Sequence, residues 1–233
     1  MVKATSLSGP RHIAIIPDGN RRWAENRGLP TLLGHKTGFD AALRLFETAL
    51  ELGIEVVTIW GFSTENWQRS KTEVVYLMKL YEQYAKRQWR KLGDQGVQVR
   101  LAGELERLPR SLQQTLATTV ERTKMNTRLV LNICLSYGGR NELVRAIKKI
   151  VALAPTPETV TEALVEQSLD TVGLPDVDLV IRTSGEQRTS GYLPWQAAYA
   201  ELYFTPVLFP DFSPDELKKA VTWYNERQRR FGK

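Results

Sequence analysis

The stretch HIAIIPDGNRRWAENRG, residues 12–28, joins a short apolar run to a cluster of charged side chains. Residues 13–16 are all apolar, and a run of this length is too short for a helix and typical of a buried strand. Asp18 follows at once, and Arg21 and Arg22 come three and four positions later. The sequence therefore predicts that a core strand delivers one carboxylate and two guanidinium groups to the same point.

The rest of the chain alternates strand-like runs with helical patterns. Strand-like runs lie at residues 56–60, 97–101, 129–134 and 179–181. Apolar residues at helical spacing lie at residues 42–50, 74–85, 112–120 and 143–150, and a last helix is predicted for residues 214–229 with Ser213 as its N-cap. This alternation predicts an α/β fold in a single domain, residues 1–233, with a central mainly parallel β-sheet flanked by helices. Residues 1–11 are predicted to form a flexible N-terminus.

The composition limits the class of protein. A chain of 233 residues with 42% hydrophobic residues can bury one sizeable core. Its single cysteine, Cys134, excludes an intrachain disulfide and lies in an apolar run, where we expect it to be buried. Two histidines and one cysteine are too few for the usual structural zinc site. No signal-peptide core and no membrane-spanning apolar run is found, so a cytoplasmic protein is expected.

The net charge of +6 indicates an anionic partner, such as nucleic acid, a membrane surface or a phosphorylated small molecule. In parallel sheets, ligands bind beyond the carboxyl ends of the strands, and Arg182 and Arg188 follow the last predicted strand there. Arginine binds phosphate through two parallel hydrogen bonds. Magnesium takes one or two carboxylates beside phosphate oxygens, and Asp18 and Glu201 are the candidates. Together these residues predict a diphosphate site with a divalent metal.

Each of these features also has a simpler interpretation. An aspartate after a strand often caps a turn, and the basic runs at 86–91 and 227–230 are typical of solvated helix faces. Nucleic acid is disfavoured because Glu65 and Glu186 lie among the arginines and would repel a phosphate backbone. The expected meeting of three arginine-bearing loops at one sheet edge favours the diphosphate site.

Seven motifs occur together along the sequence. They are HIAIIPDGNRRWA, GHKTG, FSTENWQR, SYGGR, DLVIRTSGEQRTS, AELYFTPVLFPDF and RRFG, from residue 12 to residue 232. This ordered set resembles the cis-prenyltransferase family, which includes the undecaprenyl diphosphate synthases, or isoprenyl transferases. The resemblance covers nearly the whole chain, and the paired DDxxD helices of trans-prenyltransferases are absent.

The resemblance implies a homodimeric enzyme that requires Mg²⁺ and has an apolar product tunnel between sheet and helices. Such an enzyme adds isopentenyl diphosphate to an allylic diphosphate, commonly farnesyl diphosphate, and each new double bond is Z. It has no nucleic-acid partner, and a peripheral contact with the membrane would serve release of its lipid product.

The resemblance also assigns site residues, position by position. Asp18 matches the essential carboxylate for magnesium and diphosphate, Glu201 matches a metal-site carboxylate, and Asn66 matches the position linked to proton removal. The positions that match substrate-binding residues are Gly19, Asn20, Arg21, Arg22, Trp23, His35, Ser63, Thr64, Glu65, Trp67, Arg69, Arg182, Arg188, Thr189, Ser190, Arg230 and Gly232. The last two belong to an element that is implied to reach into the partner subunit's active site.

Four positions depart from the family pattern. Thr31 stands where an arginine is common and Gln187 where a histidine is common, which puts one phosphate contact and one metal ligand in question. Arg27 or Lys36 are candidates to replace the missing arginine. The other two departures are Ser184 and Pro17, in place of a glycine and a methionine.

Two alternatives to an enzyme stay open: a non-catalytic family subunit, and a protein that binds an anionic partner such as nucleic acid or a membrane. Non-catalytic relatives lack the region of the catalytic aspartate. This chain retains Asp18, Asn66, Arg182 and Arg188 together, which favours the enzyme.

The helix after ENWQR is implied to form one wall of the product tunnel. Its large residues share one face, at positions 76, 77, 80, 81 and 84. Beyond Tyr84 the helix becomes polar, so we expect a closed tunnel and a product of short to about undecaprenyl length. The alternative is that these residues, like Trp60, Trp89 and Trp223, only pack the core.

Overall fold

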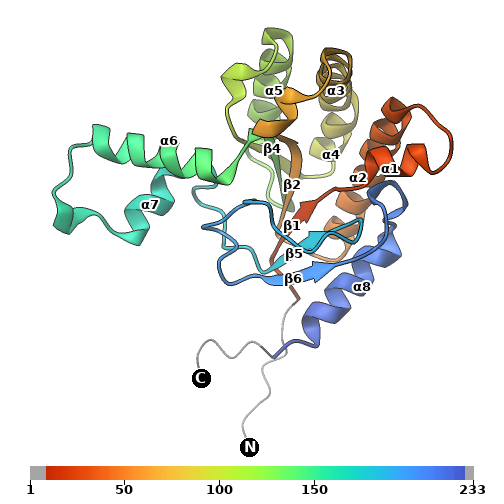
Figure 1. Ribbon diagram of the computed structural model, residues 1–233. Helices are drawn as coiled ribbons and strands as arrows, with labels where there is room; N and C mark the ends of the chain where they lie inside the picture. Colours follow the sequence, from red (N-terminus) through yellow and green to blue (C-terminus); the bar gives the residue numbers. More distant parts are fainter. Residues whose placement is uncertain (1–8, 229–233) are drawn as a thin grey trace, which may run out of the picture.

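The computed structural model describes residues 9–228 and contains one six-stranded parallel sheet, in the order β3-β4-β2-β1-β5-β6 (Figure 1). The strands are β1 (His12–Ile16), β2 (Val56–Ser63), β3 (Val97–Ala102), β4 (Leu129–Tyr137), β5 (Leu179–Arg182) and β6 (Glu201–Phe204). β1 and β2 are the central pair of strands. The residues that follow them therefore lie in the middle of the sheet, at the carboxyl ends of its strands. Of the predicted flexible N-terminus, residues 1–8 lie outside the described range, whereas Arg11 is held by Glu55 and Asp178.

The five strands predicted from the sequence are confirmed, and with them the fold class. All five residues of β1 are buried, as expected for a strand of a parallel sheet covered on both faces. β2 and β4 run three residues further than the apolar pattern predicts, to Ser63 and Tyr137. β6 is not predicted by the pattern, because it has four residues, lies at the sheet edge and is largely half-buried.

The helices are α1 (Asn20–Glu25), α2 (Thr31–Glu51), α3 (Lys71–Tyr84), α4 (Arg90–Asp94), α5 (Arg110–Thr123), α6 (Gly139–Ala152), α7 (Glu162–Ser168) and α8 (Pro214–Asn225). The five predicted helices are found at the expected positions, as α2, α3, α5, α6 and α8, whereas three short helices, α1, α4 and α7, are not predicted. Short 3₁₀ turns lie at Thr64–Gln68, Leu105–Arg107, Pro157–Thr159 and Phe209–Asp211, and a π-helical turn at Ala85–Trp89 joins α3 to α4. Ser213 caps α8 as predicted, because its Oγ accepts from the Glu216 N–H. α8 ends at Asn225, four residues before the predicted end, and residue 229 lies outside the described range.

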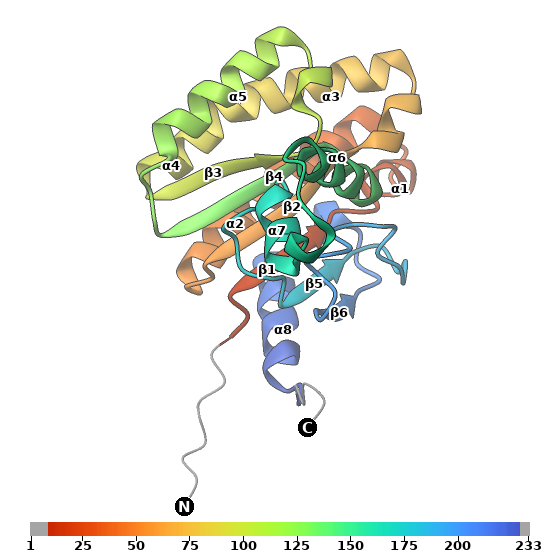
Figure 2. The same ribbon diagram turned by 90° about the vertical axis from the view of Figure 1, so that its left-hand side faces the viewer.

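The two faces of the sheet are covered differently (Figures 1 and 2). α2, α3, α5 and α8 pack on one face and form the larger core cluster with it. On the other face, the loop of residues 183–200 covers a smaller cluster with Tyr192 and Leu193. Cys134 is buried in that cluster, as predicted.

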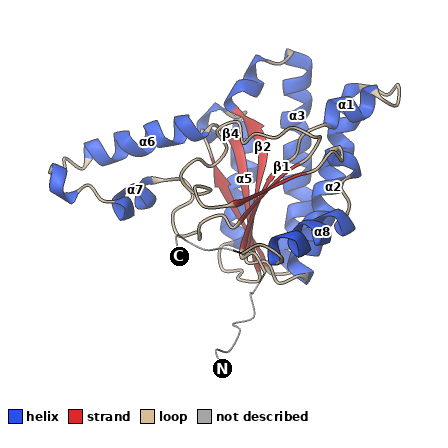
Figure 3. Ribbon diagram, turned by 60° about the horizontal axis from the view of Figure 1, so that its bottom comes forward, coloured by secondary structure: helices blue, strands red, loops and turns tan. Residues whose placement is uncertain are grey.

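α6 and α7 form an arm that projects from the sheet (Figures 1 and 3). Val144, Ile147 and Val151 lie three and four residues apart along α6 and are 51%, 57% and 69% exposed. Residues at this spacing share one face of a helix. The arm therefore presents an apolar stripe to solvent.

Candidate active site

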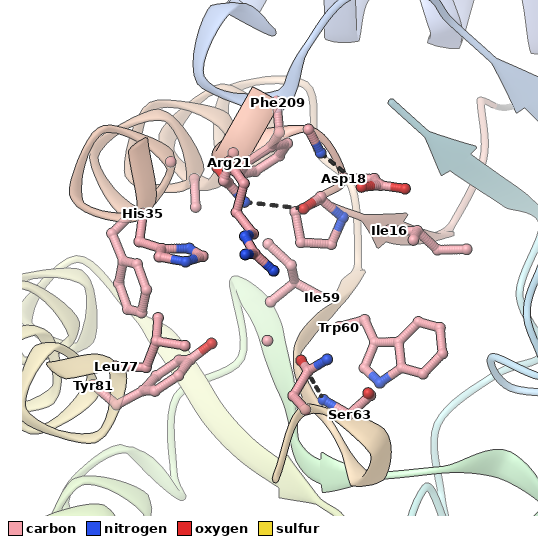
Figure 4. Close-up of a pocket in the computed structure, with 18 of the residues that line it drawn as sticks. Ile16, Asp18, Arg21, His35, Ile59, Trp60, Ser63, Leu77, Tyr81 and Phe209 are labelled. Carbon is pink, nitrogen blue, oxygen red and sulfur yellow. Dashed lines mark hydrogen bonds between the residues drawn. The ribbon is translucent and has the colours of Figure 1, made fainter. Parts of the chain in front are cut away.

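A cavity of about 790 Å³ opens beyond the carboxyl ends of β1, β2 and β5 and continues between the sheet and the helices α2 and α3 (Figure 4). Its polar half is lined by Asp18, Gly19, Asn20, Arg21, Arg22, His35, Ser63, Glu65, Asn66, Arg69, Arg182 and Ser190. Its apolar half is lined by Phe39, Ala42, Leu43, Phe46, Ile59, Leu77, Tyr81, Tyr84, Trp89 and Ile133. The structure thus brings together three loops that are distant in sequence. They meet at the carboxyl ends of the strands, beside an apolar compartment.

Asp18 is held firmly at the point where β1 ends. Its N–H donates to Thr183 Oγ1 at 2.9 Å, and its carboxylate accepts from the Gly19 N–H at 2.7 Å and from Arg182 Nη2 at 2.8 Å. About a third of its side chain (34%) stays exposed. Gly19 has a φ of 102°, and a Cβ there would lie 2.8 Å from Leu208 Cδ2, so this turn requires glycine.

The arginines of the cavity differ in how they are held. Buried Arg182 donates to Ser190 Oγ at 2.9 Å, while its Nε has no hydrogen-bond partner within the described chain. Arg22 donates to Ser184 Oγ at 2.6 Å. The Arg21 side chain makes no hydrogen bond or salt bridge among residues 9–228, lowers the pKa of His35 and Glu73 by its charge, and points into the cavity (Figure 4). The arginines that line the cavity, Arg21, Arg22, Arg69 and Arg182, outnumber its carboxylates, Asp18, Glu25 and Glu65, so its polar half favours an anion.

Arg21 and Arg22 belong to α1, which packs closely on α2. A Cβ on Gly34 would lie 2.1 Å from the carbonyl oxygen of Asn20, and a Cβ on Gly38 would lie 2.1 Å from Asn20 Oδ1. The GHKTG motif therefore places two glycines on the face of α2 that receives α1, and this close packing sets the position of the two arginines.

His35 lies in the cavity wall, where burial disfavours its charged form. Its Nε2 donates to Glu73 Oε1 at 2.9 Å, and Arg69 Nη1 donates to the same oxygen at 3.2 Å. Burial lowers the pKa of His35 below its usual value. Burial opposes the ionisation of Glu73, but His35 and Arg69 outweigh it and hold the pKa of Glu73 below its usual range. Glu73 therefore positions two residues of the cavity.

Sequence reasoning misses Glu73 for a physical reason. Ser70 is the N-cap of α3, and its Oγ accepts from the Glu73 N–H at 3.3 Å. A serine followed by a glutamate at this spacing is the signature of a capping box, which predicts a role at the start of a helix. Only the tertiary fold reveals that the carboxylate turns toward His35.

Asn66 is oriented by the loop that follows β2. The Ser63 N–H donates to Asn66 Oδ1 at 3.1 Å, as part of a capping box on the 3₁₀ turn. Because the amide oxygen is occupied, the amide nitrogen is the group left to meet a ligand in the cavity.

Five of the described positions that match substrate-binding residues do not line the cavity. They are Trp23, Thr64, Trp67, Arg188 and Thr189. The indole N–H groups of the two tryptophans donate to Asp211 and Ser136. The guanidinium of Arg188 pairs with Glu186, and only its backbone carbonyl takes part in the site, accepting from Arg182 at 2.6 Å. Arg230 and Gly232 lie outside the described residues.

Glu201, the second metal-site carboxylate implied by the resemblance, does not lie beside Asp18 within the chain and does not line the cavity. Glu201 begins β6, where it pairs with Leu179 and its N–H donates to the Asp178 carbonyl. This is the amino end of the parallel strands, whereas Asp18 follows the carboxyl end of β1. The sequence does not predict this placement, because β6 is not recognised there.

The departures from the family pattern also have defined surroundings. Arg27 and Lys36, the candidates to replace the arginine absent at Thr31, pair with Asp211 and Asp40, and neither lines the cavity. Ser184 has a φ of 78°, a conformation that favours glycine. Its hydroxyl holds Arg22, a contact that a glycine could not make.

The residues of α3 that are expected to form a tunnel wall divide between the cavity and the core. Tyr81 and Tyr84 line the cavity, whereas Tyr76 and Leu80 do not. Trp89, expected in the core, lines it as well.

Comparisons with known proteins agree with this geometry. The family model described as "Putative undecaprenyl diphosphate synthase" matches residues 16–232. The chain is 46% identical to the isoprenyl transferase of Streptococcus pyogenes over 232 residues, which cover 96% of this chain and 93% of that protein. It is 44% identical to the isoprenyl transferase of Halalkalibacterium halodurans over 227 residues, which cover 96% and 89%.

Two crystal structures share the fold. One is lavandulyl diphosphate synthase from Lavandula x intermedia in complex with dimethylallyl diphosphate, with a TM-score of 0.95 and 38% identity over 97% of this chain and 99% of that one. The other is a probable undecaprenyl diphosphate synthase from Campylobacter jejuni, with a TM-score of 0.81 and 31% identity over 96% and 99%.

Proposed function

Because the chain belongs to the undecaprenyl diphosphate synthase family of prenyltransferases, we propose that it joins isopentenyl diphosphate to an allylic diphosphate such as farnesyl diphosphate. The product is a Z-polyprenyl diphosphate. The observation that carries the proposal is the cavity, in which four arginines border a compartment of aliphatic and aromatic side chains. A prenyl diphosphate has the same division into a charged head and an apolar chain.

The reaction begins when the allylic C–O bond breaks and both electrons leave with the diphosphate. We assign the leaving diphosphate to Arg21 and Arg22, which line the polar half beside Gly19. Because the leaving group gains charge as the bond breaks, cations held in position stabilise the transition state more than the substrate.

The second diphosphate, that of isopentenyl diphosphate, is assigned to Arg182 with Ser190. Arg188 would join them when its guanidinium exchanges Glu186 for the diphosphate. The Nε of Arg182 is a buried donor without a partner in the described chain, as expected of a group that binds an anion. The double bond of isopentenyl diphosphate attacks the allylic carbon, a C–C bond forms, and loss of a proton restores a double bond. The proton passes to an oxygen of the released diphosphate. Asn66 is the residue that we assign to this proton-removal step, where its amide nitrogen would hold that diphosphate by donating a hydrogen bond.

The apolar half of the cavity serves the same reaction. A carbocation is quenched by water, and Phe39, Ile59 and Leu77 give this compartment apolar walls. The growing chain would occupy it while the two diphosphates stay at the polar end.

The residues that line the polar half of the cavity fit a magnesium ion that is bound together with substrate. Among residues 9–228, no three His, Cys, Asp or Glu side chains form a metal cluster. Magnesium on phosphate substrates usually takes one or two carboxylates and completes its shell with phosphate oxygens and water. Asp18 borders the cavity with part of its carboxylate exposed, and it would hold the ion. Magnesium would neutralise charge on the diphosphate.

We further propose a homodimer built on the apolar stripe of Val144, Ile147 and Val151. Three exposed aliphatic side chains on one face of a projecting helix are typical of a surface that another chain covers. Within the described part of the chain, no helix is long and apolar enough to cross a membrane. Release of the lipid product is proposed to use a peripheral membrane contact.

Product analysis tests the proposed function. The protein is incubated with labelled isopentenyl diphosphate, magnesium, and either farnesyl or dimethylallyl diphosphate as starter, because the lavender enzyme was solved with the latter. We expect labelled prenyl diphosphates that require both substrates and disappear with a chelator. Absence of product with every starter would favour the non-catalytic subunit. Nucleic-acid binding that falls steeply with salt would favour the anion-binding alternative.

A further inference from the structure

Four aromatic side chains form one wall of the apolar compartment between α2 and α3. We call Phe39, Tyr81, Tyr84 and Trp89 the aromatic wall. The ring centroid of Phe39 lies 4.7 Å from that of Tyr81 and 4.9 Å from that of Tyr84, and Tyr81 lies 6.5 Å from Trp89. The rings therefore pack as one continuous group rather than as separate side chains.

A hydrogen bond between α3 and α2 holds the aromatic wall closed. The Tyr84 hydroxyl on α3 donates to the Asp40 carboxylate on α2, and Lys36 lies 3.6 Å from the same carboxylate. Asp40 does not line the cavity, so its side chain acts on the compartment only through Tyr84. Because the bond bridges the two helices, it opposes their separation, which is the movement that would widen the compartment.

Tyr81 narrows the compartment from the same side. A Cβ on Gly61 of β2 would lie 2.6 Å from the Tyr81 hydroxyl oxygen, so this side chain reaches from α3 across to the sheet (Figure 4). Gly61 leaves just enough room for that hydroxyl. The compartment available to a prenyl chain is therefore narrowed in two places: between α3 and the sheet, and between α2 and α3.

The π-helical turn brings Trp89 into the wall. In a regular α-helix each residue turns about 100°, so residue 89 would lie about 140° around the axis from Tyr84. A π-helical turn holds one more residue per hydrogen-bonded ring, which rotates Trp89 back toward the face of Tyr84. Trp89 is 3% exposed and lines the cavity, although the residues around it in sequence are polar.

The volume of the cavity sets a limit on chain length. A cavity of about 150 Å³ holds one benzene molecule, so a five-carbon isoprene unit needs about 125 Å³. The whole cavity of about 790 Å³ then holds about six such units. Two diphosphates and one isopentenyl group take about three of them, which leaves about three units for the allylic chain.

We propose that the aromatic wall, closed by the bond between Asp40 and Tyr84, limits this enzyme to products of about 20 carbons, well short of the undecaprenyl class. This inference rests on the proposed function. It names Tyr84 and Asp40 as determinants of product length and places the limit at the gap between α2 and α3.

The first test is the chain length of the products, measured by mass spectrometry with farnesyl diphosphate, isopentenyl diphosphate and magnesium. We expect the wild type to stop at about four isoprene units. Tyr84→Ala should move most of the product to chains at least one unit longer, because it removes a ring from the wall. Tyr84→Phe and Asp40→Ala break the same hydrogen bond from its two sides, and both should broaden the distribution toward longer chains.

Met78→Ala is the matched control. Met78 is buried on the same helix but does not line the cavity, so this variant should lose stability and keep the wild-type product length. A wild type that makes undecaprenyl-length chains, or folded Tyr84 and Asp40 variants with unchanged products, would overturn the inference.

The second test needs no turnover and separates this inference from the proposed function. Binding of geranyl, farnesyl and geranylgeranyl diphosphate is followed by quenching of tryptophan fluorescence, with isopentenyl diphosphate present and magnesium removed by a chelator, so that the second substrate occupies its share of the cavity and no reaction takes place. Affinity should rise up to about 15 carbons and fall at 20 in the wild type, and the fall should vanish in Tyr84→Ala. An affinity that rises through 20 carbons in the wild type would refute the wall, even in a protein that forms no product.

Discussion

The Asp18 carboxylate both stabilises the loop after β1 and faces the cavity. Its carboxylate accepts from Gly19 and Arg182, while part of it stays open to the cavity. A local pattern is enough to predict this residue, because a buried strand fixes the direction in which the next residues leave the sheet.

Replacing Asp18 by alanine should nearly abolish turnover and leave the fold intact. Loss of a positioned transition-state contact typically costs a factor of about 10³ or more in kcat. Steady-state kinetics at saturating magnesium, with circular dichroism on the same sample, measures both effects. The control is Asp215→Asn, which changes an exposed carboxylate in the first turn of α8 and should leave kcat unaltered. Turnover of Asp18→Ala near that of the wild type would contradict the assigned role.

His12 makes the fold sensitive to mild acid. Its Nδ1 donates to the Pro175 carbonyl at 2.8 Å and its Nε2 accepts from Thr58 Oγ1 at 2.7 Å, an arrangement that requires the neutral ring. Burial lowers the pKa of His12 from an ordinary 6.5 to about 4. The unfolded chain therefore takes up a proton as pH falls below 6.5, while the folded chain resists it until about 4.

The free energy of unfolding should accordingly fall by about 3 kcal/mol between pH 6.5 and 4 on account of His12 alone. Urea titrations at intervals of pH measure the decrease. His12→Asn cannot take up the proton, so it should be less stable at neutral pH but should lose less stability between pH 6.5 and 5. Equal pH dependence in both proteins would exclude His12 as the cause.

The two glutamates of the site show where residue-level prediction stops. Glu73 carries a capping signature that hides its contact with His35, a residue 38 positions away. Glu201 was expected at the metal, but it starts an edge strand at the opposite end of the sheet. Both cases depend on tertiary placement, which no local pattern contains.

At the scale of elements, the regular apolar pattern of the sequence predicts most of the fold. It does not predict the irregular elements. Five strands follow from apolar runs, because parallel strands are buried on both faces. The π-helical turn escapes prediction because it changes the helical period by one residue. The polar character predicted beyond Tyr84 is correct for the surface, but Trp89 returns to the cavity through that turn.

Gly34→Ala tests the packing of α1 on α2. The added methyl group would collide with the Asn20 carbonyl, so α1 must move and carry Arg21 and Arg22 with it. Overpacking of this kind costs about 1–3 kcal/mol of stability. We expect KM for the allylic diphosphate to rise about tenfold, the equivalent of about 1.4 kcal/mol in binding.

Thr37→Ala is the control for this variant, because Thr37 lies on the same helix and does not line the cavity. Its kinetics should match the wild type. A Gly34→Ala enzyme with unchanged KM would mean that the position of α1 does not govern binding of the allylic substrate.

At the scale of the whole molecule, the arm of α6 and α7 is the feature that a single chain leaves uncovered. A stable homodimer buries about 800 Å² per partner with an apolar centre. Ile147→Asp places a charge in the middle of the apolar stripe and should convert a dimer to a monomer. Light scattering during size-exclusion chromatography measures the mass of each species.

Met125→Asp provides the comparison, because Met125 is 82% exposed and lies away from the arm, in the turn after α5. It should elute with the mass of the wild type. A wild-type protein that is monomeric at every concentration would refute the proposed dimer.

The position of β1 in the sheet has a consequence for synthesis on the ribosome. β1 pairs with β2, which follows within about 50 residues, but its other edge waits for β5, whose Leu179 pairs with Ile13. Until residue 182 has left the exit tunnel, the nascent chain exposes an unpaired apolar strand edge, the kind of surface that aggregates or binds chaperones. Arg182 arrives with β5 and completes the ion pair of Asp18. The order of translation therefore assembles the charged end of the cavity last, and we expect nascent chains released before β5 to be chaperone clients without activity.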